Sequence, residues 1–248
     1  MSTGSIWLTS ATFLCTSGLV YFWATKKNRR LLKIKDQELL SKNVTLDQLL
    51  KENEWLVKEL HHRVRNNLQI VTSLLHSQSV YLKDKEAIKA VLGSQRRIHA
   101  MALIHKYLYQ SGAMSTVSMP DYIKELVRYL HYSFHSNIHY NLQIENINLQ
   151  TVHALPLGLI LNEMVSNAIK FAFPYSTEDC ISVRFFIMSN GEICLEVKDN
   201  GRGLPDGFSM NNKTSFGMLL IKGLTDQLDG DFSIENNCGT IIRVCFFE

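Results

Sequence analysis

Apolar residues recur at helical spacing through the first part of the chain, beginning with one long uninterrupted segment. Residues 6–24 carry no charge and are mostly apolar, which is enough to cross roughly 30 Å of hydrocarbon as a helix. A cluster of lysines and arginines follows at residues 26–35. This order predicts a single transmembrane helix in the inner (plasma) membrane, with the remainder of the chain in the cytoplasm. A cleaved signal peptide and a buried globular helix are the two alternatives.

The helical pattern continues beyond the basic cluster, without proline or glycine, to about residue 78. A seven-residue repeat and its complementary seam comprise Leu39, Leu46, Asn53 and Leu60, with Leu49 and Leu56. Such a repeat predicts a cytoplasmic coiled-coil linker over residues 25–50 and therefore a homodimer, with Asn53 favouring two strands. A monomeric amphipathic helix packed on its own domain is the alternative.

A short break at residues 81–84 separates this helix from a second one, expected at about 85–109. A connection this short makes the two helices antiparallel. One helical pair buries little surface alone, so residues 51–115 are expected to dimerise through a helical hairpin that forms a four-helix bundle. The polar segment at residues 112–118 is expected to be a hinge.

From residue 119 to the end at 248, the pattern changes to a mixture of helices and strands. Helices are expected at 120–134, 155–173 and 216–228, and strands at 138–147, 181–188, 193–198, 231–235 and 240–247. The last four strands form two hairpins, the first around Asn190-Gly191. Helices gathered against antiparallel strands predict an α+β fold with a two-layer sandwich.

Cysteine usage and net charge narrow the class of protein. The five cysteines are scattered and show no Cys-x-x-Cys spacing, so we expect free thiols in a reducing compartment and no disulfide scaffold. A net charge of +3 is too small to indicate a nucleic-acid surface. We therefore expect no nucleic-acid partner.

The stretch from Glu59 to Gln69 places two adjacent histidines on the first long helix. It runs E-L-H-H-R-V-R-N-N-L-Q. On a helical wheel, His62 lies roughly 160° from the centre of the apolar stripe, whereas His61 lies about 60° from it. The wheel therefore predicts that His62 is exposed and that His61 flanks the packed seam.

Three further motifs place polar groups or glycines inside the predicted sandwich. Glu163, Asn167 and Lys170 share one face of an apolar helix, at spacings of four and three. Asp199 ends a strand, and Gly201 and Gly203 follow it, where their backbone can approach a ligand closely. Gly217 begins a helix whose first N–H groups can face phosphate oxygens, and Thr240 begins the last strand after Gly239.

In this order the motifs resemble the GHKL ATP-binding fold shared by histidine kinases, the Hsp90 chaperone, gyrase and the mismatch-repair ATPases. Together with the histidine stretch, residues 50–248 resemble a sensor histidine kinase of the HisKA_2 and HWE-like subgroup. The resemblance implies ATP and magnesium as cofactors. It also implies autophosphorylation of a histidine and transfer of the phosphoryl group to an aspartate in the receiver domain of a response regulator.

The resemblance also implies roles for individual residues. In the nucleotide pocket, Asp199 would accept the adenine amino group, and Gly201 and Gly203 would shape the pocket. Asn167 would bind Mg²⁺, and Lys170 would face the phosphates. Gly217 would hinge a lid at about residues 204–216, and Thr240 would belong to the same site. On the helix, His62 would be the phosphoacceptor and is followed by Arg63, which marks the subgroup. Glu59 could fix the tautomer of His62, and Asn66 could orient water for dephosphorylating the partner.

Glu163 leaves a second function open. In the hydrolase branches of the same superfamily, a glutamate four residues before the magnesium-binding asparagine activates water. A GHKL-type ATPase that drives a conformational cycle is therefore the alternative, and a catalytically inactive dimeric signalling scaffold is a third. An exposed histidine on a dimerising helix favours the kinase.

Overall fold

The computed structural model describes the chain except residues 1–2, 111–115, 174–178 and 206–214. Within the helices, the side chains of residues 3–22, 24, 31, 34 and 109–110 are also outside the description. The chain divides into two compact units, residues 1–57 and residues 58–248.

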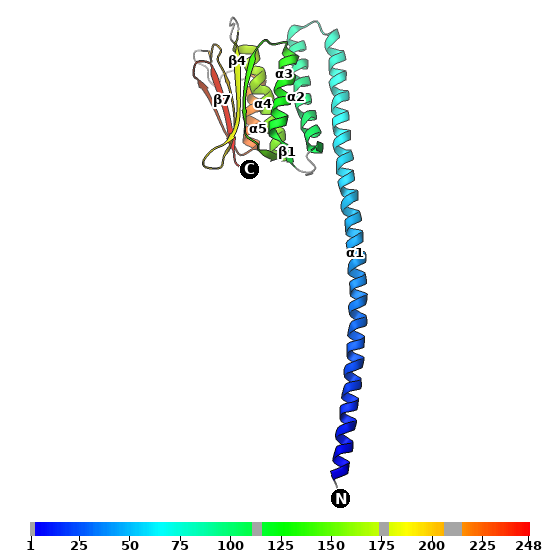
Figure 1. Ribbon diagram of the computed structural model, residues 1–248. Coiled ribbons are helices and arrows are strands. Elements are labelled where there is room, and N and C mark those ends of the chain that lie inside the picture. Colours follow the sequence, from blue (N-terminus) through cyan, green and yellow to red (C-terminus); the bar gives the residue numbers. More distant parts are fainter. Residues whose placement is uncertain (1–2, 111–115, 174–178, 206–214) are drawn as a thin grey trace. The chain divides into compact units, whose positions relative to one another are not determined.

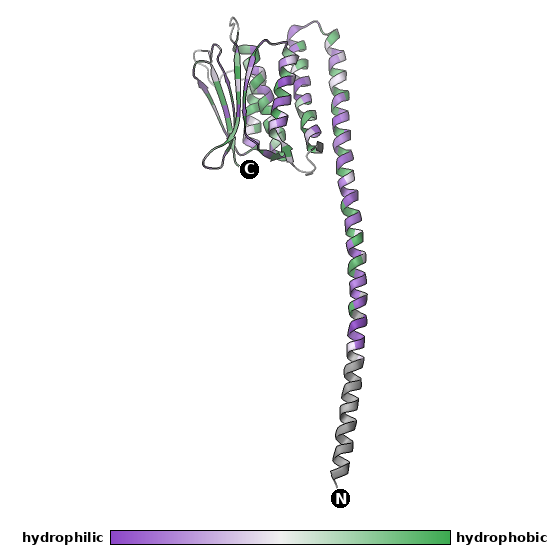
Figure 2. Ribbon diagram, viewed as in Figure 1, coloured by the Kyte–Doolittle hydropathy of each residue, from purple (hydrophilic) through white to green (hydrophobic). Residues whose placement is uncertain are grey.

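The described residues of the first unit belong to α1, which runs from Thr3 to Tyr81 without a break. The predicted transmembrane segment, residues 6–24, falls in this helix, and nearly all of its side chains are outside the described residues. Figure 2 shows hydrophobic residues alternating with hydrophilic ones along the helix after this segment. The seam leucines Leu39, Leu46, Leu49 and Leu56 are each 54–58% exposed, so the predicted stripe is present but uncovered.

Among the described residues, one helix is long and apolar enough to cross a membrane, and it belongs to the second unit. This helix, α4, runs from Thr151 to Phe171, and 72% of its apolar window is buried inside the structure. Its apolar character therefore reflects its place in the protein core.

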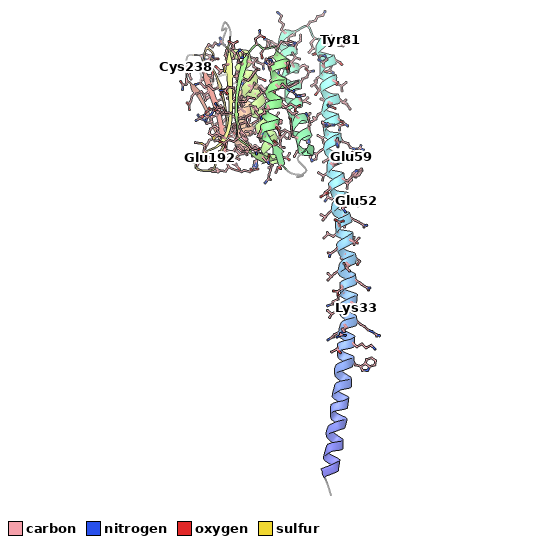
Figure 3. The ribbon with its side chains drawn as sticks, in the orientation of Figure 1. Lys33, Glu52, Glu59, Tyr81, Glu192 and Cys238 are labelled. Carbon is pink, nitrogen blue, oxygen red and sulfur yellow. A yellow bond between two sulfur atoms is a disulfide. The ribbon has the colours of Figure 1, made fainter. Side chains whose placement is uncertain are left out.

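The second unit begins with the predicted helical hairpin. Helix α1 ends at Tyr81 (labelled in Figure 3) and α2 runs from Lys85 to Gln110, which confirms the predicted break. Asp84 supports the start of α2 because its carboxylate accepts the backbone N–H groups of Glu86 and Ala87 at 3.1 and 3.3 Å. The hairpin is not separate from the sandwich: α2 buries Leu103, Ile104 and two neighbouring apolar residues in the same core as the helices that follow.

A five-stranded sheet forms the second layer of the unit. Its order is β2-β4-β5-β7-β6, with bounds His139–Ile144, Cys180–Ile187, Ile193–Asp199, Thr240–Phe246 and Asp231–Asn236. A separate small sheet pairs β1 (Thr116–Ser118) with β3 (Asn148–Gln150). Both predicted hairpins are confirmed. The strand expected at 138–147 corresponds to β2, which is shorter, and the small strand β3 follows it at Asn148–Gln150 without having been predicted.

One pairing differs from the expected antiparallel sheet. Strand β2 runs parallel to β4, and the other pairs are antiparallel. A parallel pair needs a long crossover connection, and α4 supplies it, since it lies between these strands in the sequence. The result is an α+β sandwich.

Helices cover one face of the sheet (Figure 1). They are α3 (Met119–Phe134), α4, and α5 (Phe216–Gln227), with α2 packed against α3 and α4. The inward side chains of β4, β5 and β7 join these helices in one core that includes Phe185, Leu195, Val244 and Phe246, all nearly or fully buried. Alternate residues on the same strands face the opposite side of the sheet.

A disulfide on the opposite face of the sheet shows that our expectation of free thiols was wrong for two of the five cysteines. Cys194 on β5 and Cys245 on β7 form a disulfide with a Cα–Cα distance of 4.2 Å. The two residues are register partners in the β5–β7 ladder, although 51 positions separate them in the sequence. Spacing along the chain cannot show this pair, because only strand pairing brings the two residues together. Among the described residues, Cys180 and Cys238 are free.

Candidate functional site

A cavity of about 230 Å³ opens where α4 faces the ends of β5 and β7. Asn167 comes from α4, Asp199 from β5 and Thr240 from β7, while Gly203 lies in the turn after β5 and Met218 in the first turn of α5. The lining is mostly apolar, with a few convergent polar groups, as expected for a site that binds a flat organic ring. Four residues predicted for the site (Asn167, Asp199, Gly203 and Thr240) thus line one cavity.

The carboxylate of Asp199 is held by backbone groups alone among the hydrogen bonds that the structure records. Its Oδ1 accepts the N–H of Gly201 at 2.9 Å and the N–H of Thr240 at 3.1 Å. The residue is only 5% exposed. Both bonds go to the same oxygen, so Oδ2 can accept a further donor, such as the amino group of a purine.

The two glycines after Asp199, Gly201 and Gly203, lie where a side chain would collide with neighbouring atoms. A Cβ at Gly201 would lie 2.3 Å from the carbonyl oxygen of Ala172 at the end of α4. The chain is held there by the N–H of Arg202, which donates to the same carbonyl at 3.0 Å. Gly203 has φ +75°, and its Cβ would lie 2.2 Å from Oδ1 of Asn236. These glycines let the turn close over the cavity between α4 and β6.

Asn167 fits the magnesium-binding role. Its Nδ2 donates to the sulfur of Met218 at 3.7 Å, so Oδ1 is the atom left to coordinate a cation. Mg²⁺ prefers oxygen ligands and commonly takes only one or two from the protein besides phosphate oxygens. The donor set at this end of the cavity therefore suits magnesium bound together with a nucleotide.

Gly217 packs directly against Glu163 rather than lining the cavity. A Cβ at Gly217 would lie 2.7 Å from Oε2 of Glu163 and 3.8 Å from Nδ2 of Asn167. Glycine here allows α5 to approach α4 beside the cavity. Most of the predicted lid, residues 206–214, lies outside the described residues.

Glu163 and Lys170 do not line the cavity in the described part of the chain. The Glu163 carboxylate is buried and accepts hydrogen bonds from Arg97 on α2. The ammonium of Lys170 lies 5.9 Å from the centre of the Phe134 ring. Desolvation, together with the positive charge of Arg96, lowers the pKa of Lys170. The expected polar stripe on α4 is thus divided: Asn167 lines the cavity, Glu163 contacts α2, and Lys170 lies against Phe134 on α3.

The two adjacent histidines lie on the part of α1 that packs against α2. The Nδ1 atoms of His61 and His105 are 3.1 Å apart, so His61 lies in the packed seam as the wheel predicts. Burial, with a further contribution from His61, lowers the pKa of His105. His62 is half-buried rather than fully exposed.

The neighbours of His62 on α1 are arranged along the helix surface. Glu59, labelled in Figure 3, accepts a hydrogen bond from Nε of Arg63 at 2.7 Å. This ion pair gives the Glu59 carboxylate a partner other than the imidazole we expected. Asn66 is exposed, one helical turn beyond His62.

Arg97 and His105, the two α2 residues that make these contacts, were not predicted as site residues. A pair of arginines, Arg96 and Arg97, inside an otherwise apolar helical pattern was the available signal. Arg96 is only 5% exposed, and a buried arginine almost always has a partner. Arg96 lies over the ring of Phe134 on α3, and Arg97 pairs with Glu163 on α4. The position of neither partner could be found from spacing.

Two protein-family models match the chain. HisKA_2, described as a histidine kinase family, matches residues 59–134, and the family of histidine kinase-, DNA gyrase B- and HSP90-like ATPases matches residues 153–248. The first match contains the histidine pair and α2. The second contains every residue that lines the cavity.

Curated relatives match most of the chain. The chain is 31% identical to the sensor histidine kinase PdtaS of Mycolicibacterium smegmatis, over 83% of this chain and 39% of the relative. It is 29% identical to PdtaS of Mycobacterium tuberculosis, over 86% of this chain and 42% of that one. The chain therefore spans about two fifths of the length of these relatives.

A solved structure has the same fold. The histidine kinase domain of the EL346 blue-light activated histidine kinase from Erythrobacter litoralis matches with a TM-score of 0.59 and 20% identity. The match covers 77% of this chain and 91% of the solved one.

Proposed function

The chain belongs to the histidine kinases of the HisKA_2 type, with an ATPase domain of the GHKL type, and from this premise we propose that it transfers the γ-phosphoryl group of ATP to His62. The phosphoryl group then passes to an aspartate in the receiver domain of a response regulator. The observation that carries the proposal is the cavity at Asp199, whose free carboxylate oxygen suits the adenine amino group.

Asp199, Gly201 and Gly203 would hold and enclose the base, and the apolar lining, which includes Met218, would contact the ring. Asn167 would hold Mg²⁺ through Oδ1, and the ion would neutralise charge on the phosphates as the group transfers. The first N–H groups of α5, beginning near Gly217, would face phosphate oxygens. Lys170 would need to leave Phe134 to reach the phosphates.

The acceptor must be a histidine on α1 whose ring can leave the helical seam. His61 lies toward His105 in the α1–α2 seam, whereas the helical wheel places His62 on the side away from the apolar stripe, which supports His62 as the acceptor. The unprotonated ring nitrogen of His62 attacks the γ-phosphorus, and the bond from that phosphorus to the bridging oxygen breaks. ADP departs with the bonding electrons, and the proton on the other ring nitrogen is lost to solvent or to Glu59.

Three further features support a membrane-anchored homodimer. The exposed leucine seam of α1, including Leu46 and Leu56, is a surface that a second copy of the helix would bury. The apolar segment at residues 6–24 would anchor the dimer, and the basic cluster that follows would face the cytoplasm.

Asn66 would orient water during dephosphorylation of the partner.

The test is incorporation of labelled phosphate from Mg-ATP. We expect a phosphoprotein that loses its label in acid and retains it in alkali, since phosphohistidine has that stability. His62→Ala should abolish the label, and His61→Ala should reduce it less. Abolition by His61→Ala with full labelling of His62→Ala would assign the acceptor to His61 instead. A label stable in acid would overturn histidine phosphorylation.

A further inference from the structure

We propose that Arg97 is a positioning residue that keeps Glu163 from activating water, so that the γ-phosphoryl group goes to the histidine rather than to solvent. This inference rests on the proposed kinase function and deepens it. It concerns a contact between α2 of the hairpin and α4 of the ATP-binding layer.

The guanidinium of Arg97 donates hydrogen bonds to both oxygens of the Glu163 carboxylate. Nε donates to Oε1 at 2.9 Å, and Nη2 donates to Oε2 at 3.2 Å. Nδ2 of Asn162 also donates to Oε1, at 2.9 Å. A carboxylate offers roughly four lone-pair positions, and three of them are taken by fixed donors here. The side chain of Glu163 is 5% exposed, so little room remains for water.

Glu163 nevertheless lies beside the place where phosphate chemistry would occur. Its Oε2 lies close to the backbone of Gly217, and the same position is close to the amide of Asn167. A general base must reach the proton that it removes at hydrogen-bond distance. In this proposal, the hydrogen bonds that Arg97 and Asn162 donate to its oxygens are what keep Glu163 from acting as a base.

The two outcomes differ in the attacking atom and the fate of its proton. In hydrolysis, the oxygen of water attacks the γ-phosphorus, the bond to the bridging oxygen breaks, and ADP leaves with the bonding electrons. The proton of water then needs an acceptor, which is the role of Glu163 in the ATPase alternative. In transfer to His62, the same bond breaks but nitrogen forms the new one, and no water needs to be deprotonated.

Arg97 is placed so that the hairpin controls this contact. It belongs to α2, which packs against the histidine-bearing part of α1, and its guanidinium also lies 4.7 Å from the centre of the Phe216 ring at the start of α5. One side chain thus contacts α4 and α5 while being carried by α2. Withdrawal of α2 would free Glu163.

Replacing Arg97 would not leave Glu163 without positive charge nearby. Arg96 and Lys170 both interact electrostatically with the Glu163 carboxylate. A neutral residue at position 97 therefore removes the two hydrogen bonds from the guanidinium, while the positive charges of Arg96 and Lys170 remain near Glu163. This makes Arg97→Met a specific test of the hydrogen bonds.

The experiment compares two products of Mg-ATP in the full chain: free phosphate and acid-labile phosphoprotein. In Arg97→Met we expect phosphate release to rise on the order of tenfold, while labelling falls. Arg97→Lys, which keeps the charge but not the two hydrogen bonds from the guanidinium, should lie between Arg97→Met and the wild type. Glu163→Gln in the Arg97→Met background should return phosphate release to the wild-type rate. The faster release in Arg97→Met should also show a carboxylate limb in its pH profile, which the double variant lacks.

Arg184→Met serves as the matched control, since Arg184 pairs with a glutamate on the far face of the sheet. It should change neither product. Unchanged phosphate release in an Arg97→Met protein that still binds ATP would overturn the role of Arg97. Glu163→Gln alone tests the same role if Arg97→Met does not fold: it should leave the slow release unchanged, and a tenfold fall would show that Glu163 acts as a base despite Arg97. A wild-type chain without acid-labile label would overturn the kinase function, and phosphate release would still test Arg97.

Discussion

Strand β5 carries two buried carboxylates, three residues apart, that face opposite sides of the sheet. Asp199 faces the helices and is 5% exposed, and Glu196 faces the other side and is 6% exposed. Glu196 is neutralised by two arginines, with Arg184 at 3.1 Å and Arg243 in a two-pronged contact. Asp199 accepts only the backbone N–H groups of Gly201 and Thr240 in the hydrogen bonds that the structure records.

The difference between these two residues separates a structural carboxylate from the one that we propose binds the nucleotide. Glu196 has its partners on the neighbouring strands β4 and β7, so both of its oxygens are satisfied within the sheet. Asp199 lines the cavity, and both of its recorded hydrogen bonds go to Oδ1. Burial alone does not distinguish the two residues, whereas the identity of their partners does.

The largest effect should come from Asp199→Asn. The amide can still accept the two backbone N–H groups, but the second oxygen is replaced by a donor that opposes the adenine amino group. We expect a loss of ATP affinity on the order of a hundredfold, measured by calorimetry. Glu196→Gln on the same strand is the control and should leave the affinity unchanged. Equal losses in the two variants would remove the distinction between the two faces.

Reduction of the Cys194–Cys245 disulfide should be the next largest effect, and it should act on stability only. The bridge joins residues 51 positions apart, so it restricts the unfolded chain. We expect reduction to lower the free energy of unfolding by about 2 kcal/mol, measured by urea denaturation with and without reductant. ATP affinity of the folded protein should not change. A reduced protein that loses ATP binding while folded would link the outer face to the cavity.

Removing the arginines from Glu196 should have smaller and unequal effects. Arg243 is 37% exposed and makes the two-pronged contact, and Arg184 is 43% exposed. We expect Arg243→Met to cost about 1–2 kcal/mol of unfolding free energy, and Arg184→Met less than about 1 kcal/mol. Thermal unfolding of both variants in the same buffer would measure the order. The opposite order would mean that Arg184 is the main partner.

The smallest effect should be on the pH dependence of stability. Burial alone would raise the pKa of Glu196, but the hydrogen bonds and charges of Arg243 and Arg184 outweigh it, so the pKa lies below its ordinary value of 4.5. The contribution to stability is therefore fully present above pH 4.5 and is lost as the pH falls through the lowered pKa of the folded state. The difference in unfolding free energy between wild type and Glu196→Gln should shrink as the pH falls from 7 to 3. A constant difference would contradict the lowered pKa.

Most elements of the sandwich could be predicted from local pattern. The break at residues 82–84, helix α5 and both hairpins follow from periodicity and turn residues, which act over a few positions. Helix α4 begins at Thr151, earlier than expected, and contains Pro156 inside it. The parallel pairing of β2 with β4 was missed, since alternation along a strand carries no information on its direction relative to a neighbour.

The candidate site divides in the same way. Asn167, Asp199, Gly203 and Thr240 were recognisable because each stands in a short motif at the end of an element, and the structure brings all four to one cavity. Glu163 and Lys170 were recognised as polar positions on the same helix, but their surroundings were not. Arg97 and His105 were missed, because their contacts join residues that are distant in the sequence.

By itself, the amino-acid sequence determined which residues could form helices, strands and turns, and which short motifs could recognise a nucleotide. These properties depend on neighbours within a few positions. Only the tertiary structure decided that Cys194 forms a disulfide with Cys245 and that Glu196 is neutralised by two arginines. It also decided that Arg97 hydrogen-bonds the carboxylate of Glu163. Such pairings depend on strand register and helix packing, which form between distant parts of the chain and leave no trace in local spacing.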